Sequence, residues 1–153
     1  YGLKPVMSPR RNEQTTAPPS AVEGAQMLMS RGLPVRGAAW LSGNIQAESA
    51  WAGQRPNWEL DDGAGRNGGL LSWNRSRLDA LEARYGKPSN QITVEQQIDF
   101  LLDELKKYPE ANRIFRNAYA TDRQLIRASK LFIGYGIEGD RYSIGRQVEQ
   151  QLN

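Results

Sequence analysis

The feature that most constrains the fold is one long stretch without periodicity between two regions of helical periodicity. Apolar residues recur at helical spacing up to about residue 51 and again from about residue 74. Between them, residues 53–69 hold five glycines and one proline. Loops of that length inside a compact domain are usually functional. The pattern predicts one mainly α-helical domain with a small irregular lobe, in which short strands can form.

Start and stop signals divide the periodic regions into separate helices. Thr93 with Gln96 and Thr121 with Gln124 have the spacing of capping boxes. We expect helices at about residues 20–31, 35–51, 74–85, 93–105, 109–119, 121–132 and 142–152.

The first 19 residues differ in composition from the rest. They contain four prolines among polar and charged residues, and too few apolar positions to pack on a core. We therefore expect residues 1–19 to be a linker or an N-terminal arm of a larger protein, and residues 20–153 to be the folded domain. A first residue that is Tyr rather than Met agrees with a processed piece of a longer chain.

One carboxylate lies on the apolar side of the helix expected over residues 35–51. At about 100° per residue, Glu48 falls within about 20° of Leu41, in the middle of the apolar arc. A glycine and a proline soon afterwards place Glu48 in the last turn or two. The opposite, polar arc takes Ser42, Gln46 and Ser49.

Burial of Glu48 and the negative end of the helix dipole would both favour its protonated form. A carboxylic acid that keeps its proton near neutral pH can donate it to the alkoxide that departs when a glycosidic bond breaks. The sequence thus favours a general acid at Glu48. The alternative is a buried structural glutamate that bonds to backbone groups.

Composition excludes several other chemistries. The chain has no His and no Cys, so it cannot form a Ser/His/Asp triad, a Cys/His nucleophile or most zinc hydrolase sites. Asp and Glu must carry any catalysis, and we expect no cofactor and no metal.

The net charge of +3 suits an anionic partner, but without a concentrated run of Lys and Arg we expect no binding to nucleic acid. No apolar run is long enough to span a membrane.

All four tryptophans lie within 34 positions around the candidate acid. Indole rings offer flat faces to sugars, so Trp51, Trp58 and Trp73 are candidate substrate contacts, although each could instead pack in the core. Gly69 is a further candidate, because paired glycines let the backbone approach a ligand closely.

In the segment 97–105, the acids Asp99, Asp103 and Glu104 are interpreted as surface charges, with Asp103 placed to pair with Lys107.

Three blocks in this order resemble the phage tail lysozyme family, the lysozyme-like domains of bacteriophage tail proteins. They are the run Gly43–Ser49 with the sequence GNIQAES, the segment from Gly68 to Arg77 with Trp73 inside it, and Gln97–Leu105 with the sequence QIDFLLDEL. The resemblance covers about residues 20–150. Relatives usually carry Gln where this chain has Ser72.

The resemblance implies an α+β lysozyme superfold, with a helical body, a small β lobe and a cleft between them. It implies that Glu48 is the general acid, with Asn44, Gln46 and Ser72 as further substrate-binding positions. The implied activity is a muramidase that cuts the β-1,4 bond between N-acetylmuramic acid and N-acetylglucosamine in peptidoglycan. It would act on the host cell wall or periplasm from the tail of a virion, alongside other tail proteins.

Glycosidases of this kind use a second carboxylate. The candidates are Glu59, Asp61 and Asp62, and we favour Asp61 or Asp62 because they fall deeper in the irregular stretch. Without a second acid, a lytic transglycosylase that acts on the same bond is the alternative. An alternative of another class is a non-catalytic module that binds the wall or has a structural role in the tail.

Overall fold

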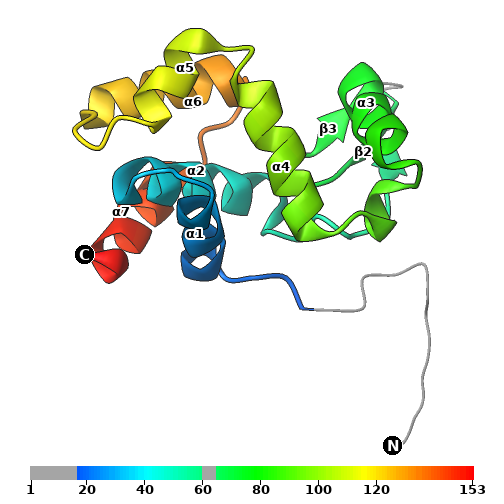
Figure 1. Cartoon of the computed structure of the whole chain (residues 1–153), viewed down its shortest axis with the longest axis horizontal. Coiled ribbons are helices and arrows are strands. Elements are labelled where there is room, and N and C mark those ends of the chain that lie inside the picture. The colour runs from blue at the N-terminus through cyan, green and yellow to red at the C-terminus, as the bar shows by residue number, and fades with distance from the viewer. Residues whose placement is uncertain (1–16, 60–64) are drawn as a thin grey trace, which may run out of the picture.

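The structure is a computed structural model that describes residues 17–59 and 65–153 (Figure 1). Most of the predicted linker, residues 1–16, therefore lies outside the described residues. No helix in the described ranges is both long and apolar enough to cross a membrane. The elements in chain order are α1 (Ala21–Ser30), α2 (Val35–Ser49), β1 (Trp58–Glu59), β2 (Arg66–Gly68), β3 (Trp73–Asn74), α3 (Arg75–Tyr85), the 3-10 helix η1 (Ser89–Gln91), α4 (Val94–Leu105), α5 (Pro109–Phe115), α6 (Asp122–Ile133) and α7 (Arg141–Leu152).

The observed fold confirms a mainly helical α+β protein. The helical body consists of α1, α2, α5, α6 and α7, while the three strands and α3 form a small lobe at the other end (Figure 1). Helix α4 runs between these two parts. The predicted capping boxes at Thr93 and Thr121 are both confirmed. The predicted helix from residue 109 is shorter than expected: it ends at Phe115, and Tyr119 lies beyond it with 90% of its surface exposed.

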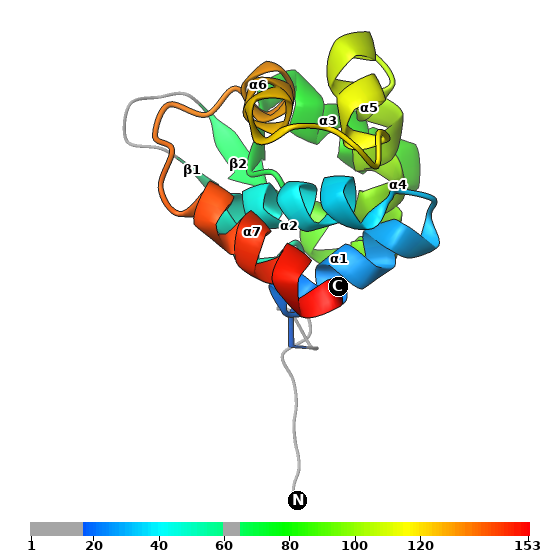
Figure 2. The same cartoon turned by 90° about the vertical axis from the view of Figure 1, so that its left-hand side faces the viewer.

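Helix α2 is the central helix of the body. Helices α1 and α7 pack on one side of it, and α5 and α6 on the other (Figure 2). As a result, residues 37–45 are buried without interruption. The prediction of a polar arc on this helix is wrong for Ser42 and Ser49, because both are buried. Their hydroxyls are satisfied by backbone instead: Ser42 Oγ donates to the Ala21 carbonyl at 2.6 Å, and Ser49 Oγ donates to the Ile45 carbonyl at 3.2 Å.

Two glycines allow neighbouring segments to approach α2 at backbone distance. A Cβ atom on Gly37 would lie 1.7 Å from the carbonyl oxygen of Phe115 at the end of α5. A Cβ atom on Gly43 would lie 2.4 Å from the carbonyl oxygen of Arg141 at the start of α7. Any larger residue at either position would push the helices apart, so these glycines set the tight packing around α2.

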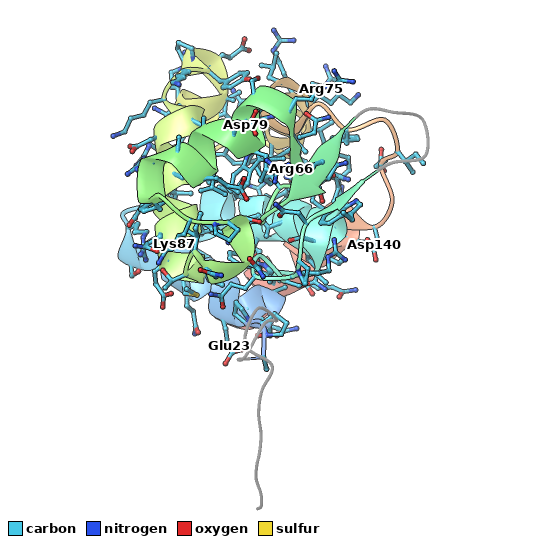
Figure 3. All side chains as sticks on the ribbon, turned by 90° about the vertical axis from the view of Figure 1, so that its right-hand side faces the viewer. Glu23, Arg66, Arg75, Asp79, Lys87 and Asp140 are labelled. Carbon is cyan, nitrogen blue, oxygen red and sulfur yellow. The ribbon has the colours of Figure 1, made fainter. Side chains whose placement is uncertain are left out.

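The small lobe is built on an antiparallel sheet in the order β1-β2-β3. Trp58 pairs with Asn67, and Gly68 pairs with Trp73. Helix α3 packs beside this sheet, and Arg66 of β2 reaches across to Asp79 of α3 at 3.0 Å (Figure 3). The described parts of the irregular stretch therefore contribute β1 and β2 to a small β lobe, which is tied to the helix that follows it.

The buried side chain of Gln97 in α4 fixes both ends of the small lobe. Its Oε1 accepts a hydrogen bond from the Leu70 backbone N–H at 3.0 Å. Its Nε2 lies 2.7–3.1 Å from three backbone carbonyl oxygens, those of Gly53, Ser89 and Ile92. One amide thus connects α4 to the start of the irregular stretch, to its end and to η1.

Candidate active site

Glu48 lies in the last turn of α2, as predicted. Its side chain is 19% exposed, so most of it is enclosed while a part remains accessible to solvent. The backbone at this position is also held from the small lobe, because Ser72 Oγ donates to the Glu48 carbonyl at 2.7 Å. Ser72 belongs to a turn closed by its own N–H and the Gly69 carbonyl. Ser72 and Gly69 therefore have visible structural functions beside the candidate acid.

The helix ends with two residues in the left-handed conformation. Ala50 has φ of 53° and Trp51 has φ of 61°, although neither is glycine. The Ala50 N–H still bonds to the carbonyl of Gln46 at 2.9 Å. Such backbone conformations are unfavourable for residues with a Cβ atom and persist only where the surroundings enforce them. Here they turn the chain back immediately after Glu48, so that Trp51 packs into the body.

A buried arginine from the far end of the chain pairs with the candidate acid. Arg141, at the start of α7, donates from Nη2 to Glu48 Oε2 at 2.8 Å, and its side chain is 4% exposed. Its other donors reach Asn44 Oδ1 at 3.2 Å and the Glu138 carbonyl at 2.7 Å. The guanidinium also lies 4.0 Å from the ring centroid of Tyr135. Arg141 therefore has a single enforced position, and it holds one oxygen of Glu48 in place.

Arg141 changes the electrostatics expected at Glu48. Burial and the helix dipole act on Glu48 from its own helix, whereas the guanidinium of Arg141 reaches it from α7 and lies 2.8 Å from one carboxyl oxygen. In the described part of the chain, the second oxygen, Glu48 Oε1, accepts no hydrogen bond from the protein. One oxygen of the Glu48 carboxyl is therefore held by Arg141, while the other has no hydrogen-bond partner among the described residues.

The two polar residues nearest Glu48 on α2 have different positions. Asn44 is fully buried: its Nδ2 donates to Ser129 Oγ at 2.9 Å, and its Oδ1 accepts from Arg141. In this structure it orients the arginine and has no surface for a substrate. Gln46 is partly exposed, but residues two positions apart on a helix point away from each other, so it does not face the Glu48 carboxyl.

Of the three tryptophans proposed as substrate contacts, only one has an accessible ring. Trp51 is 0% exposed, with Nε1 donating to Ser42 Oγ at 3.0 Å, and Trp73 is 1% exposed. Both rings are core residues here. Trp58, at the start of β1, is partly exposed and lies under the guanidinium of Arg55, whose Cζ is 4.1 Å from the ring centroid.

The interpretation of Glu104 as a surface charge is wrong. Its side chain is 11% exposed and accepts two hydrogen bonds from Arg77, both at 2.9 Å, and one from Trp73 Nε1 at 2.8 Å. The sequence gives no sign that Glu104 is buried or that it pairs with Arg77, because the two residues are 27 positions apart and on different helices. Asp103 is exposed as expected, but it pairs with Arg84 and with Lys106 rather than with Lys107.

The second carboxylate stays a prediction. Asp61 and Asp62 lie outside the described residues, and Glu59 is placed only through its backbone, which pairs with Arg66 in the sheet. Within residues 17–59 and 65–153, no group of three or more acids lies close enough to hold a metal ion.

A model of the phage tail lysozyme family matches residues 20–138, which is most of the chain. The chain belongs to this family, in agreement with the resemblance seen in the sequence. Membership identifies a lysozyme-like phage protein, with peptidoglycan as the class of substrate and the phage tail as its context. Searches of curated proteins and of solved structures each gave no match.

Proposed function

We propose that this protein is a muramidase that cuts the β-1,4 bond between N-acetylmuramic acid and N-acetylglucosamine, with Glu48 as the general acid. The observation that carries the proposal is the state of the Glu48 carboxyl: one oxygen is fixed by the buried Arg141, and the other is unbonded within the described residues. A partly exposed acid in a fixed orientation can approach a glycosidic oxygen.

In this mechanism Glu48 protonates the departing sugar oxygen as the bond to the anomeric carbon breaks. The carboxylate that forms is stabilised at once by Arg141, 2.8 Å from Oε2. Arg141 is therefore a positioning residue that also compensates the charge developed on the acid. Asp61 or Asp62 would supply the second carboxylate, from the stretch between β1 and β2. Used by a virion, this reaction would open the wall locally during infection.

The test is digestion of purified peptidoglycan by the wild type and by Glu48→Gln, with mass analysis of the soluble fragments. The substitution keeps the shape of the side chain but removes the transferable proton, so we expect the rate to fall by about 10²- to 10⁴-fold. Glu95→Gln is the matched control, because Glu95 is exposed on α4, and it should retain full activity.

The ends of the released sugars then decide the mechanism. Reducing muramic acid ends mean hydrolysis, and in that case Asp61→Asn and Asp62→Asn should be compared to find the second acid. Anhydro ends would instead mean a lytic transglycosylase that uses Glu48 first as acid and then as base. If the wild type binds walls but releases nothing from walls of several chemotypes, the chain is a binding module and the proposal is wrong.

A further inference from the structure

The partly exposed tryptophan of the small lobe forms part of a surface hollow. The hollow has a volume of about 280 Å³, and Arg55, Pro56 and Trp58 line it. Its apolar surface comes from the proline and indole rings, and its positive charge comes from the guanidinium. Sites for drug-sized ligands usually measure about 300–1,000 Å³, so this hollow suits a fragment smaller than a disaccharide.

The guanidinium of Arg55 lies against an aromatic ring. Its Cζ lies 4.1 Å from the centroid of the Trp58 ring, and no carboxylate pairs with it among the side chains that the structure describes, which do not include that of Glu59. Exposed arginines elsewhere, such as Arg84 and Arg127, do pair with acids. A guanidinium whose flat face stacks on an indole can still donate hydrogen bonds from the N–H groups at its edge. Those N–H groups have the geometry that matches a carboxylate.

The hollow is close to Glu48 along the chain. Arg55 follows Glu48 by seven positions, so the two Cα atoms are at most about 25 Å apart. Hydrogen bonds from Ala52 N–H to the Ser49 carbonyl and from Arg55 N–H to the Ala52 carbonyl fold this connection into turns and shorten it further. A short peptide attached to a sugar at the scissile bond, at about 3.3–3.6 Å per residue, covers such a distance.

The chemistry of the proposed substrate shows which part of it would be recognised. The sugars of an intact glycan strand are neutral, because the lactyl group of muramic acid is amidated by the stem peptide. The free carboxylates of peptidoglycan lie on those peptides. An arginine that no described carboxylate engages, beside a small apolar surface, matches a carboxylate with an adjacent short aliphatic side chain.

We infer that the hollow formed by Arg55, Pro56 and Trp58 is a subsite for the stem peptide, with Arg55 binding a stem carboxylate while stacked on Trp58. The inference rests on the proposed function. It adds a specificity determinant outside the sugar-cleaving centre, so the enzyme would distinguish peptide-bearing strands from strands whose peptide carboxylates are blocked.

The first experiment compares the 153-residue wild type with Arg55→Ala on two substrates: intact walls, and walls whose stem carboxylates have been amidated chemically. On intact walls, Arg55→Ala should raise KM about tenfold or more with little change in kcat, as expected for loss of a charged hydrogen bond made equally in the bound and transition states. On amidated walls, wild type and variant should be equal. Arg123→Ala, at an exposed arginine in α6, controls for general charge attraction and should match the wild type on both substrates.

A second measurement needs no cleavage. Three of the four tryptophans are at most 1% exposed, so fluorescence changes on ligand binding report mainly on Trp58. In a Glu48→Gln background, a soluble stem tetrapeptide should change the emission, and both Arg55→Ala and amidation of the peptide should weaken its binding about tenfold or more. Arg55→Lys, which keeps the charge, should restore part of the affinity.

The outcomes separate the inference from the proposed function. If the wild type cleaves both wall preparations and Arg55→Ala behaves like the wild type on intact walls, the subsite is wrong while the enzyme stands. An equal loss on intact and amidated walls would also overturn it, because a carboxylate would then not be the ligand. If the wild type cleaves neither wall preparation, the proposed function fails. Independently of cleavage, stem-peptide binding that is unchanged in Arg55→Ala would overturn the subsite.

Discussion

Replacing Gln97 with methionine should destabilise the small lobe far more than its single side chain suggests. Methionine has a similar length and shape but no amide, and position 97 is fully buried. The Gln97 amide has two N–H groups shared among three backbone carbonyls at 2.7–3.1 Å, and its oxygen accepts one further bond at 3.0 Å. All four hydrogen bonds are lost at once, although the Ser89 carbonyl keeps the bond that it accepts from the Ile92 N–H at 3.1 Å.

Three backbone groups, the Gly53 and Ile92 carbonyls and the Leu70 N–H, lose their bond to the amide in an enclosed site, at about 1–1.5 kcal/mol apiece. The expected decrease in the free energy of unfolding is about 3–4.5 kcal/mol, which for a chain of this size lowers Tm by about 10 °C. Urea unfolding followed by circular dichroism measures the first quantity, and a thermal scan the second. Activity on walls should fall as well, because Gly53 and Leu70 position the segments that flank the irregular stretch.

Gln147→Met is the matched control, because Gln147 is exposed in α7 and its replacement should change stability by less than about 0.5 kcal/mol. A decrease below about 1 kcal/mol for Gln97→Met would refute the reasoning. It would mean that the backbone groups around position 97 find other partners, and that the amide does not hold the lobe in place.

Three other predictions follow from local features. Ala50→Gly should stabilise the protein by about 0.5–1 kcal/mol, because glycine adopts the left-handed φ of 53° without strain. Ala47→Gly, in the regular part of α2, is the control and should destabilise the protein by about 1 kcal/mol. Thermal scans of the two variants measure both effects. Burial alone would raise the pKa of Glu82, but hydrogen bonds from Arg66, from Asn57 and from the Ser89 backbone outweigh it, so the pKa lies below the ordinary value of 4.5. The folded state should therefore lose stability as the pH falls below about 4.5, and Glu82→Gln should flatten that dependence in urea unfolding between about pH 3 and pH 6. Arg141→Lys keeps the charge but loses the fork that reaches both Glu48 and Asn44, so kcat should fall by about tenfold or more with KM little changed in steady-state assays.

The sequence predicts those parts of the fold that depend on neighbouring residues. Capping boxes need only residues three positions apart, and both predicted boxes are present at Thr93 and Thr121. The stop signals after Glu48 likewise place it correctly in the last turn of α2. The strands could not be located, because segments of two or three residues are too short to show an alternating pattern.

Contacts between distant residues could not be predicted in the same way. Arg141 is 93 positions from Glu48, and nothing near either residue marks the pair. Burial of the tryptophans was equally hidden, since an aromatic residue suits both a core and a sugar site. Glu104 looked like a surface acid because its helix has a charged face, whereas its burial depends on how α3 lies against α4.

The position of Arg141 bears on how this domain could be used as a building block. The match to the family ends at residue 138, three positions before the arginine that pairs with Glu48. A chimera designed from the matched segment alone would omit α7, which packs along α2, and would leave a largely enclosed acid without its cation. Transplanting the module into another tail protein or an engineered antibacterial fusion therefore requires the segment up to Leu152.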